Sequence, residues 1–210
     1  MLLLSLLKII FTMKKFICLF SVLFFVSSFV FAQTETKYPE GLKVGDKAPD
    51  FTAKDQNGKT IYLSQALKNG PVVMLFYRGQ WCPYCNKQLI RFSDSLQLLT
   101  AKGASVMAVT PEVAENVKKT VEKTKATFPI IEDEGLMIMK SYKVNFAVDE
   151  NTVTKYKGYG IDFDKANGSN GTNLPVPATY IIGTDGNIKY VFFNTDYRKR
   201  VSVQEILNNL

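Results

Sequence analysis

Two cysteines three positions apart, Cys82 and Cys85, constrain the fold of this chain more than any other feature. They follow the apolar run 72–77, which is typical of a strand buried on both faces. A helical pattern begins directly after them, with Leu89 and Phe92 on its apolar face. The order predicts a buried strand, a short turn and a helix whose first turn carries both thiols.

Further apolar segments extend this unit into a domain. Strand patterns occur at 104–109 and 128–131, and helical patterns separate them. Hairpins are predicted at both ends of the domain, around 55–58 and 184–187, where Asn and Gly occupy turn positions between short strands. Because buried strands alternate with helices, we expect an α/β three-layer sandwich with a mixed central sheet and an N-terminal β-hairpin extension.

Two other segments carry local predictions. Thr110, Pro111 and Glu112 are typical of a helix start, since they offer a cap, a first-turn proline and an acid near the positive end of the helix dipole. Residues 143–174 are polar and rich in glycine, and we expect an insertion with one helix and a loop. The domain that contains this insertion is expected to span 42–210.

The cysteine spacing favours thiol–disulfide chemistry. A thiolate at the amino end of a helix is stabilised by unpaired N–H groups and the helix dipole. Pro83 suits the first helical turn, so we expect Cys82 to be the exposed attacking thiol. Cys85 lies one turn deeper and is expected to resolve a mixed disulfide or a sulfenic acid. The alternative is a pair of structural cysteines that only pack.

Two neighbours of the pair are candidate substrate-positioning residues. Arg78 lies four positions before Cys82, where its charge would lower the thiol pKa or orient a peroxide. The alternative for Arg78 is a plain surface arginine. Trp81 either flanks the active surface or packs against the domain.

The chain contains no histidine, which excludes Ser-His-Asp and Cys-His catalysis. Apart from Cys18 near the start of the chain, the cysteines are Cys82 and Cys85, which supply half of a tetrahedral zinc site, and no second pair or histidine completes it. We therefore expect no metal and no organic cofactor.

The first 32 residues resemble a secretory signal peptide. A basic start at Met13-Lys14-Lys15 precedes the apolar run 16–31, and Met13 is a possible true start of translation. We expect export to the periplasm, with a retained membrane tether as the alternative.

The basic excess of the chain is small. The formal net charge is +7, and without the three lysines of the leader it is +4. The densest basic cluster, 198–200, is interpreted as a solvated turn before a helix. Nucleic-acid binding is not expected.

Several segments together resemble the AhpC/TSA redoxins, a thioredoxin-fold family, and in particular their peroxiredoxin-like branch. The resemblance covers roughly residues 42–207 and depends on the segments 44–51, 57–59, 76–79, 174–182, 185–186 and 196–198, together with the strand–Trp-Cys-x-x-Cys–helix unit. It implies that Cys82 is the peroxidatic or attacking cysteine and Cys85 its partner. It also implies that Pro177, preceded by Val176, is a cis-proline facing the pair.

Gly79 departs from the family pattern. Typical peroxiredoxins carry threonine or serine three residues before the peroxidatic cysteine, and this chain has Gly79 there. Three hypotheses therefore stay open: a thiol-dependent peroxidase, a disulfide oxidoreductase acting on exported proteins, and a redox-inert binding module using a groove beside Pro177. The expected partners are a hydroperoxide or a protein disulfide, with an external thiol or thioredoxin-like electron donor, and the oligomeric state is left open.

Overall fold

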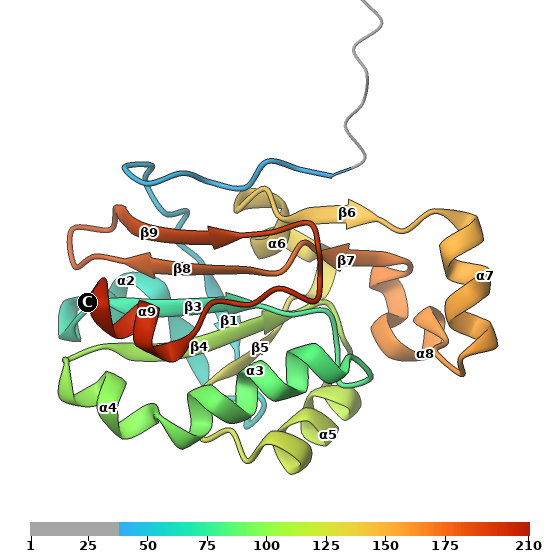
Figure 1. The fold of residues 1–210 in the computed structure, drawn as a ribbon, viewed down its shortest axis with the longest axis horizontal. Coiled ribbons are helices and arrows are strands. Elements are labelled where there is room, and N and C mark those ends of the chain that lie inside the picture. The colour runs from blue at the N-terminus through green and yellow to red at the C-terminus, as the bar shows by residue number, and fades with distance from the viewer. Residues whose placement is uncertain (1–37) are drawn as a thin grey trace, which may run out of the picture. The chain divides into compact units, whose positions relative to one another are not determined.

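A mixed five-stranded sheet forms the centre of the domain. The computed structural model describes residues 38–210 (Figure 1). Strands β3, β4 and β5 are parallel, whereas β8 runs antiparallel to β3 and β9 antiparallel to β8. The order from edge to edge is β5 (Ile130–Glu132), β4 (Ser105–Thr110), β3 (Val72–Phe76), β8 (Ala178–Ile182) and β9 (Ile188–Phe193).

Strand β3 is apolar at every position because both of its faces are covered. Met74 and Phe76 contribute to one apolar cluster, and Val73, Leu75 and Tyr77 contribute to the other. Alternate side chains of a strand point to opposite faces, so a central strand needs no polar positions. The prediction of a buried central strand is confirmed.

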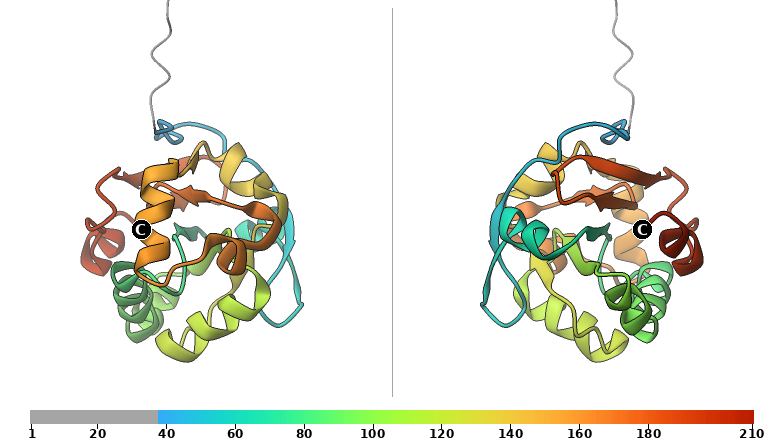
Figure 2. Two further views of the ribbon diagram at one scale, coloured as in Figure 1. Left: turned by 90° about the vertical axis from the view of Figure 1, so that its right-hand side faces the viewer. Right: turned by 90° about the vertical axis from the view of Figure 1, so that its left-hand side faces the viewer.

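Helices cover both faces of the sheet, as Figure 2 shows. One face packs against residues of α3 (Pro83–Asp94), α4 (Leu96–Ala101), α5 (Ala114–Thr124) and α9 (Val203–Asn208). The other face packs against α2 (Leu63–Ala66), η1 (Leu67–Asn69), η2 (Glu134–Leu136) and α6 (Met137–Ser141). The predicted three-layer α/β sandwich is therefore confirmed.

Both predicted hairpins are present. Strands β1 (Thr52–Lys54) and β2 (Thr60–Tyr62) pair antiparallel, and Gly58 in their turn has φ 76°. Positive φ is a conformation that glycine adopts without steric cost. At the other end β8 and β9 pair, and Ser202 Oγ accepts the Glu205 N–H at 3.1 Å to cap α9.

The segment 143–174 is more regular than the single helix and loop that we expect from the sequence. It holds β6 (Asn145–Ala147), α7 (Glu150–Gly158), α8 (Phe163–Asn167), η3 (Gly168–Asn170) and β7 (Asn173–Pro175), and β6 pairs with β7. Helix α7 has no fully buried residue, so its sequence lacks a strong apolar stripe. It is capped instead by Asp149, which accepts the Thr152 N–H.

The predicted helix start at 110–112 is wrong. Thr110 is the last residue of β4, and its carbonyl accepts the Asp133 N–H. Helix α5 begins only at Ala114, because Val113 is still extended (ψ 156°) and the Thr110 carbonyl, which would accept the first intrahelical hydrogen bond, is already bonded to Asp133 N–H. This tertiary bond delays the helix and leaves Glu112 in the turn before it.

The predicted signal peptide, residues 1–32 with Met13 as the alternative start, lies outside the described residues. Within 38–210, no helix is long and apolar enough to cross a membrane.

Candidate active site

The cysteine turn joins β3 to α3. Cys82 is the residue before the helix, with extended backbone dihedrals (φ −89°, ψ 109°), and Pro83 occupies the first helical position. Proline is favoured there because the first-turn N–H groups have no partner within the helix. The Cys85 N–H donates to Cys82 O at 3.1 Å, so both thiols belong to the first turn.

Both thiols are reduced and buried, with 1% of Cys82 and none of Cys85 exposed. Cys82 belongs to the same apolar cluster as Tyr77 and Leu89. The expectation that Cys82 is exposed is therefore wrong, because its side chain turns into the domain. A substrate reaches this sulfur only when its covering side chains move.

The two thiols are hydrogen-bonded to each other. Cys82 donates to the Cys85 sulfur, and this bond together with burial raises the pKa of Cys82 above its ordinary value. Burial alone would raise the pKa of Cys85 too, but the Cys82 thiol and the positive charge of Arg200 outweigh it and lower the pKa of Cys85 to about 6. The Arg200 contact thus favours the thiolate form of Cys85, whereas the helix-terminus argument favours that of Cys82.

Arg200 contacts the cysteine pair from the other end of the chain. Its Nη2 donates to Cys85 Sγ at 3.3 Å across 115 residues of sequence. Its Nη1 donates to the carbonyl oxygens of Tyr197 and Lys199, which fixes the guanidinium plane. The interpretation of 198–200 as a solvated turn holds for Arg198, which is exposed, but is wrong for Arg200.

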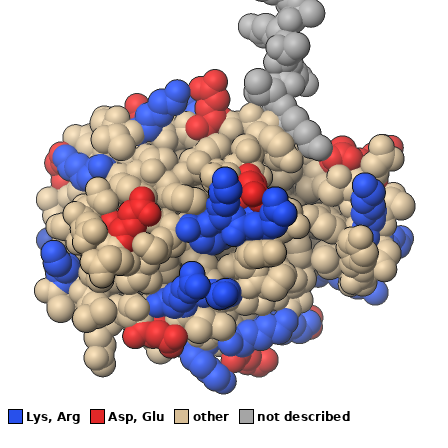
Figure 3. Space-filling view, viewed as in Figure 1, with Lys and Arg blue, Asp and Glu red and all other residues tan. Residues whose placement is uncertain are grey.

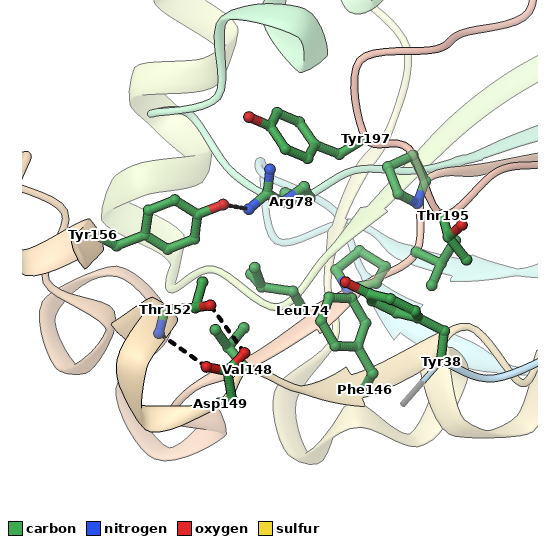
Figure 4. A pocket seen from close by; sticks show the side chains of 13 residues that line it. Tyr38, Arg78, Phe146, Val148, Asp149, Thr152, Tyr156, Leu174, Thr195 and Tyr197 are labelled. Carbon is green, nitrogen blue, oxygen red and sulfur yellow. Dashed lines mark hydrogen bonds between the residues drawn. The ribbon is translucent and has the colours of Figure 1, made fainter. Parts of the chain in front are cut away.

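Arg78 is buried rather than on the surface, with 4% exposed. Its guanidinium lies 4.3 Å from the ring centre of Tyr197, 4.9 Å from that of Trp81 and 5.3 Å from that of Tyr156. It also donates to the Tyr156 hydroxyl (Figure 4). The Arg78 charge lowers the pKa of Cys82, against the stronger effects that raise it.

Trp81 joins the cysteine turn to the insertion. Its ring contacts Tyr156 at 5.5 Å and Phe163 edge-on at 5.9 Å. These contacts show that Trp81 packs, and its buried Nε1 has no hydrogen-bond partner within the described residues.

Glu112 lies beside Gly79. Glu112 is fully buried, and its Oε2 accepts the Gln80 N–H at 2.7 Å, while its Oε1 lacks a partner in the described part of the chain. Burial raises the pKa of Glu112 to about 8. A Cβ atom on Gly79 would lie 2.7 Å from Glu112 Oε1 and 2.5 Å from Trp81 Nε1. The space that a side chain at position 79 would need is therefore occupied by a carboxyl group and an indole.

A pocket opens next to Arg78 (Figure 4). Its volume is about 160 Å³, and Pro177 is one of the residues that line it. No peptide bond within 38–210 is cis, so the expected cis-proline at Pro177 is wrong. Val176 N–H donates to Val144 O and Pro177 O accepts the Asn194 N–H, so both residues continue ladders that keep the chain extended. The pocket is lined by Tyr38, Arg78, Phe146, Val148, Asp149, Thr152, Tyr156, Leu174, Pro175, Val176, Pro177, Thr195 and Tyr197.

Among the described residues, no group of three or more His, Cys, Asp or Glu side chains is placed to hold a metal ion. Figure 3 shows Lys and Arg interspersed with Asp and Glu on the face viewed there. The chemistry of the site thus depends on the two thiols and the groups around them.

A family model described as the AhpC/TSA family matches residues 44–191, which include the cysteine turn, Arg78 and Pro177. The chain belongs to the AhpC/TSA family. The resemblance stated from the sequence is thereby confirmed.

Relatives and solved structures agree with the AhpC/TSA assignment. The chain is 30% identical to the chloroplastic peroxiredoxin Q of Oryza sativa subsp. japonica over 79% of its own length and 65% of the relative's. It is similar in fold to peroxidoxin BcpB from Mycobacterium tuberculosis (TM-score 0.62, 23% identity, 80% and 96% of the two chains). It is also similar in fold to a putative protein disulfide isomerase from Bacteroides thetaiotaomicron (TM-score 0.58, 17% identity, 82% and 91%). The match thus spans about two thirds of the rice relative, and the two structures support the thioredoxin-like fold.

Sequence reasoning missed Glu112 and Arg200 as residues of the AhpC/TSA site. An acidic residue just after a buried strand is a weak signal of a functional site. At Glu112 that acid was assigned to a helix start instead. No local signal marks Arg200, because its contact with Cys85 arises from packing of the segment before α9 against α3.

Proposed function

We propose that this protein is a thiol-dependent peroxidase that reduces hydroperoxides through Cys82 and Cys85. The proposal is supported by AhpC/TSA membership, by relatives that are named peroxiredoxin Q, and by a dithiol at the start of a helix. The observation that carries it is the geometry of the pair: both cysteines lie in the first turn of α3, and Arg200 Nη2 donates to Cys85 Sγ at 3.3 Å. Two thiols in one helical turn, with a cation beside them, supply a nucleophile and its resolving thiol.

The reaction proceeds in two balanced steps. The proton between the sulfurs moves to Cys85, and the Cys82 thiolate attacks the terminal peroxide oxygen, which breaks the O–O bond and releases an alkoxide or hydroxide. That leaving group takes the proton of Cys85, and Cys82 is now a sulfenic acid. The Cys85 thiolate then attacks the Cys82 sulfur, expels hydroxide and forms the disulfide, which an external dithiol of the thioredoxin type reduces.

The pocket beside Arg78 is the proposed approach for the peroxide. Its walls are mainly apolar and aromatic, and Arg78 supplies the cation in the wall. Arg78 is proposed to position the substrate, as expected from the sequence, together with Pro177 in the pocket wall. Trp81, the other candidate, does not line this pocket, and its ring packs on the Arg78 guanidinium.

The test is peroxide consumption by the purified protein with thioredoxin and its reductase as donor. Wild type is expected to turn over, Cys82→Ser to be inactive, and Cys85→Ser to perform one turnover that leaves a sulfenic acid trapped by dimedone. A wild-type rate equal to that of Cys82→Ser would contradict the proposal. Ser93→Ala, a substitution in α3 beyond the cysteine turn, is the matched control for small changes in the helix.

A disulfide oxidoreductase is the second candidate function, and Gly79 is the observation that favours it. With glycine at position 79, no side-chain hydroxyl at that position aligns a peroxide, whereas attack on a disulfide sulfur needs none. Insulin reduction measured in parallel separates the two candidates. A Cys82-dependent insulin rate without peroxide consumption would favour the second.

We also propose that the protein is exported, on the basis of the leader pattern in residues 1–32. The mass of the N-terminal peptide from a fractionated host cell tests this proposal. A mature terminus near Gln33 in the periplasmic fraction is expected, and an intact leader in the cytoplasmic fraction would contradict it.

A further inference from the structure

Arg200 is the residue of the basic cluster 198–200 that the proposed reaction leaves unexplained. It reaches the Cys85 sulfur from the segment between β9 and α9, while its neighbour Arg198 pairs with Asp196 in solvent. Two carbonyl oxygens of its own segment hold the other side of the guanidinium. Since no carboxylate within the described residues lies in a salt bridge with Arg200, its charge is directed at the sulfur rather than neutralised by an acid.

The Cys85 sulfur accepts hydrogen bonds from three directions. The Cys82 thiol, the backbone N–H of Arg78 and the Arg200 guanidinium all donate to it. The other titratable groups that act on it electrostatically are Glu112 and Tyr77, which is buried beneath the turn. These donors converge on a site for an anion, and the anion is the Cys85 thiolate.

We propose that Arg200 is a catalytic residue of the resolving step, holding Cys85 as a thiolate that condenses with the Cys82 sulfenic acid before a second peroxide reaches it. The inference rests on the proposed peroxidase function. The sulfenic acid has two fates. Either the Cys85 thiolate attacks the Cys82 sulfur and hydroxide leaves, or a second peroxide transfers one oxygen to that sulfur, giving sulfinic acid and an alcohol or water.

The size of the effect follows from the ionisation of Cys85. At pH 6 about half of Cys85 is thiolate with Arg200 present, because its pKa is about 6. If the pKa returns to about 8.5 without Arg200, the thiolate fraction falls by roughly two orders of magnitude. The less stable thiolate is about tenfold more nucleophilic, which offsets part of the loss. The net expectation is a resolving step about tenfold slower at pH 6.

The experiment measures how the sulfenic acid divides between its two fates. The full chain, carrying Cys18→Ser so that only the pair reacts, is mixed with hydrogen peroxide at pH 6 and the sulfinic acid at Cys82 is measured by mass spectrometry. Because both fates start from the same intermediate, this ratio does not depend on the rate of the first step. Arg200→Gln and Arg200→Met are compared with Arg198→Gln, the matched control in the same segment.

We expect about tenfold more sulfinic acid per turnover in the Arg200 variants and a wild-type value for Arg198→Gln. A rise below about threefold in a folded Arg200 variant, or an equal rise in Arg198→Gln, overturns the proposal.

A second measurement uses no peroxide. In the Cys82→Ser variant the serine hydroxyl still donates to Cys85, and thiolate absorbance at 240 nm reports the titration of Cys85. With Arg200 present, the midpoint of the Cys85 titration is expected near pH 6. With Arg200→Gln, the midpoint is expected to rise by about one pH unit or more. A Cys85 that titrates near its ordinary value with Arg200 in place overturns the proposal. This titration uses a variant that keeps Arg200 and needs no peroxide. It therefore tests the proposal even if the Arg200 variants do not fold or the wild type is not a peroxidase.

Discussion

Gly79 and Glu112 share one small space beside the cysteine turn, since a Cβ atom on Gly79 would lie 2.7 Å from Glu112 Oε1. The Glu112 carboxyl is fixed there by the Gln80 N–H, and Pro111 before it is held by Asn170. Glycine at position 79 is therefore a packing requirement of this chain. The hydroxyl of typical peroxiredoxins is not simply missing, because a buried carboxyl group takes its space.

Gly79→Thr is expected to destabilise the fold instead of restoring a peroxide-aligning hydroxyl. The new side chain collides with Glu112 and Trp81, and overpacking of this kind costs about 1–3 kcal/mol. The free energy of unfolding in urea measures the cost. Gly158→Ala, at a glycine with open space around its Cβ position, is the control and is expected to keep or raise stability. Equal stability of Gly79→Thr and wild type would contradict the packing argument.

Glu112→Gln is expected to change how stability depends on pH. Burial raises the pKa of Glu112 from 4.5 to about 8, so the folded state binds a proton that the unfolded state releases between these values. The contribution of Glu112 to the free energy of unfolding is therefore greatest below pH 4.5, and it is lost as the pH rises to 8. Relative to wild type, Glu112→Gln gains stability across this range, by roughly 1.4 kcal/mol per pH unit at most.

Urea unfolding at pH 5, 6.5 and 8 measures the gain of Glu112→Gln over wild type. A difference that stays constant with pH would show that the carboxyl is ionised in the folded state throughout. The control is Glu115→Gln, for which the opposite sign is expected. The hydrogen bond and charge of Lys119 lower the pKa of Glu115 below 4.5, so the stability that Glu115 contributes is constant from pH 5 to 8 and is lost only at lower pH.

Arg78→Met is expected to weaken both the fold and the reactivity of the pair. The guanidinium packs among three aromatic rings and donates to Tyr156, and these contacts are worth about 1–3 kcal/mol together. Without its charge the pKa of Cys82 rises further, so iodoacetamide labelling of Cys82 at pH 7, resolved from that of Cys85 by fragment mass spectrometry, slows. Arg91→Met, at an exposed position of α3, is the control and should leave labelling unchanged. Labelling of Arg78→Met at the wild-type rate would argue against an electrostatic role.

Asn170→Ala is expected to loosen the insertion from the turn that carries Glu112. The Asn170 amide donates to Pro111 O at 2.8 Å and to Asp133 O at 3.0 Å, and accepts the Gly135 N–H at 2.9 Å. Buried groups left without partners cost about 1–3 kcal/mol each, so a loss of at least about 2 kcal/mol is expected in thermal or urea unfolding. The control Asn69→Ala removes an exposed bond of 3.5 Å and should be near neutral. A loss no larger than that of Asn69→Ala would contradict this role.

The two ends of the domain were predictable because their signals are local. The turn at Gly58 and the Ser202 cap each depend on residues within a few positions of one another. The segment 143–174 was less predictable, since Asp149 begins α7 without a buried stripe behind it. At Thr110 a local helix signal was overridden, because Thr110 ends β4 and its carbonyl accepts the Asp133 N–H from the neighbouring strand segment.

The features of the candidate site likewise divide into those that depend on neighbouring residues and those that depend on distant ones. The position of Cys82 and Cys85 in the first turn of a helix after a buried strand could be predicted, because strand, proline and helix signals are contiguous there. The burial of both sulfurs and the contact of Arg200 with Cys85 follow instead from how distant segments pack. Burial and long-range charge depend on segments up to 115 residues apart, and no pattern along the chain encodes which distant segments will pack together.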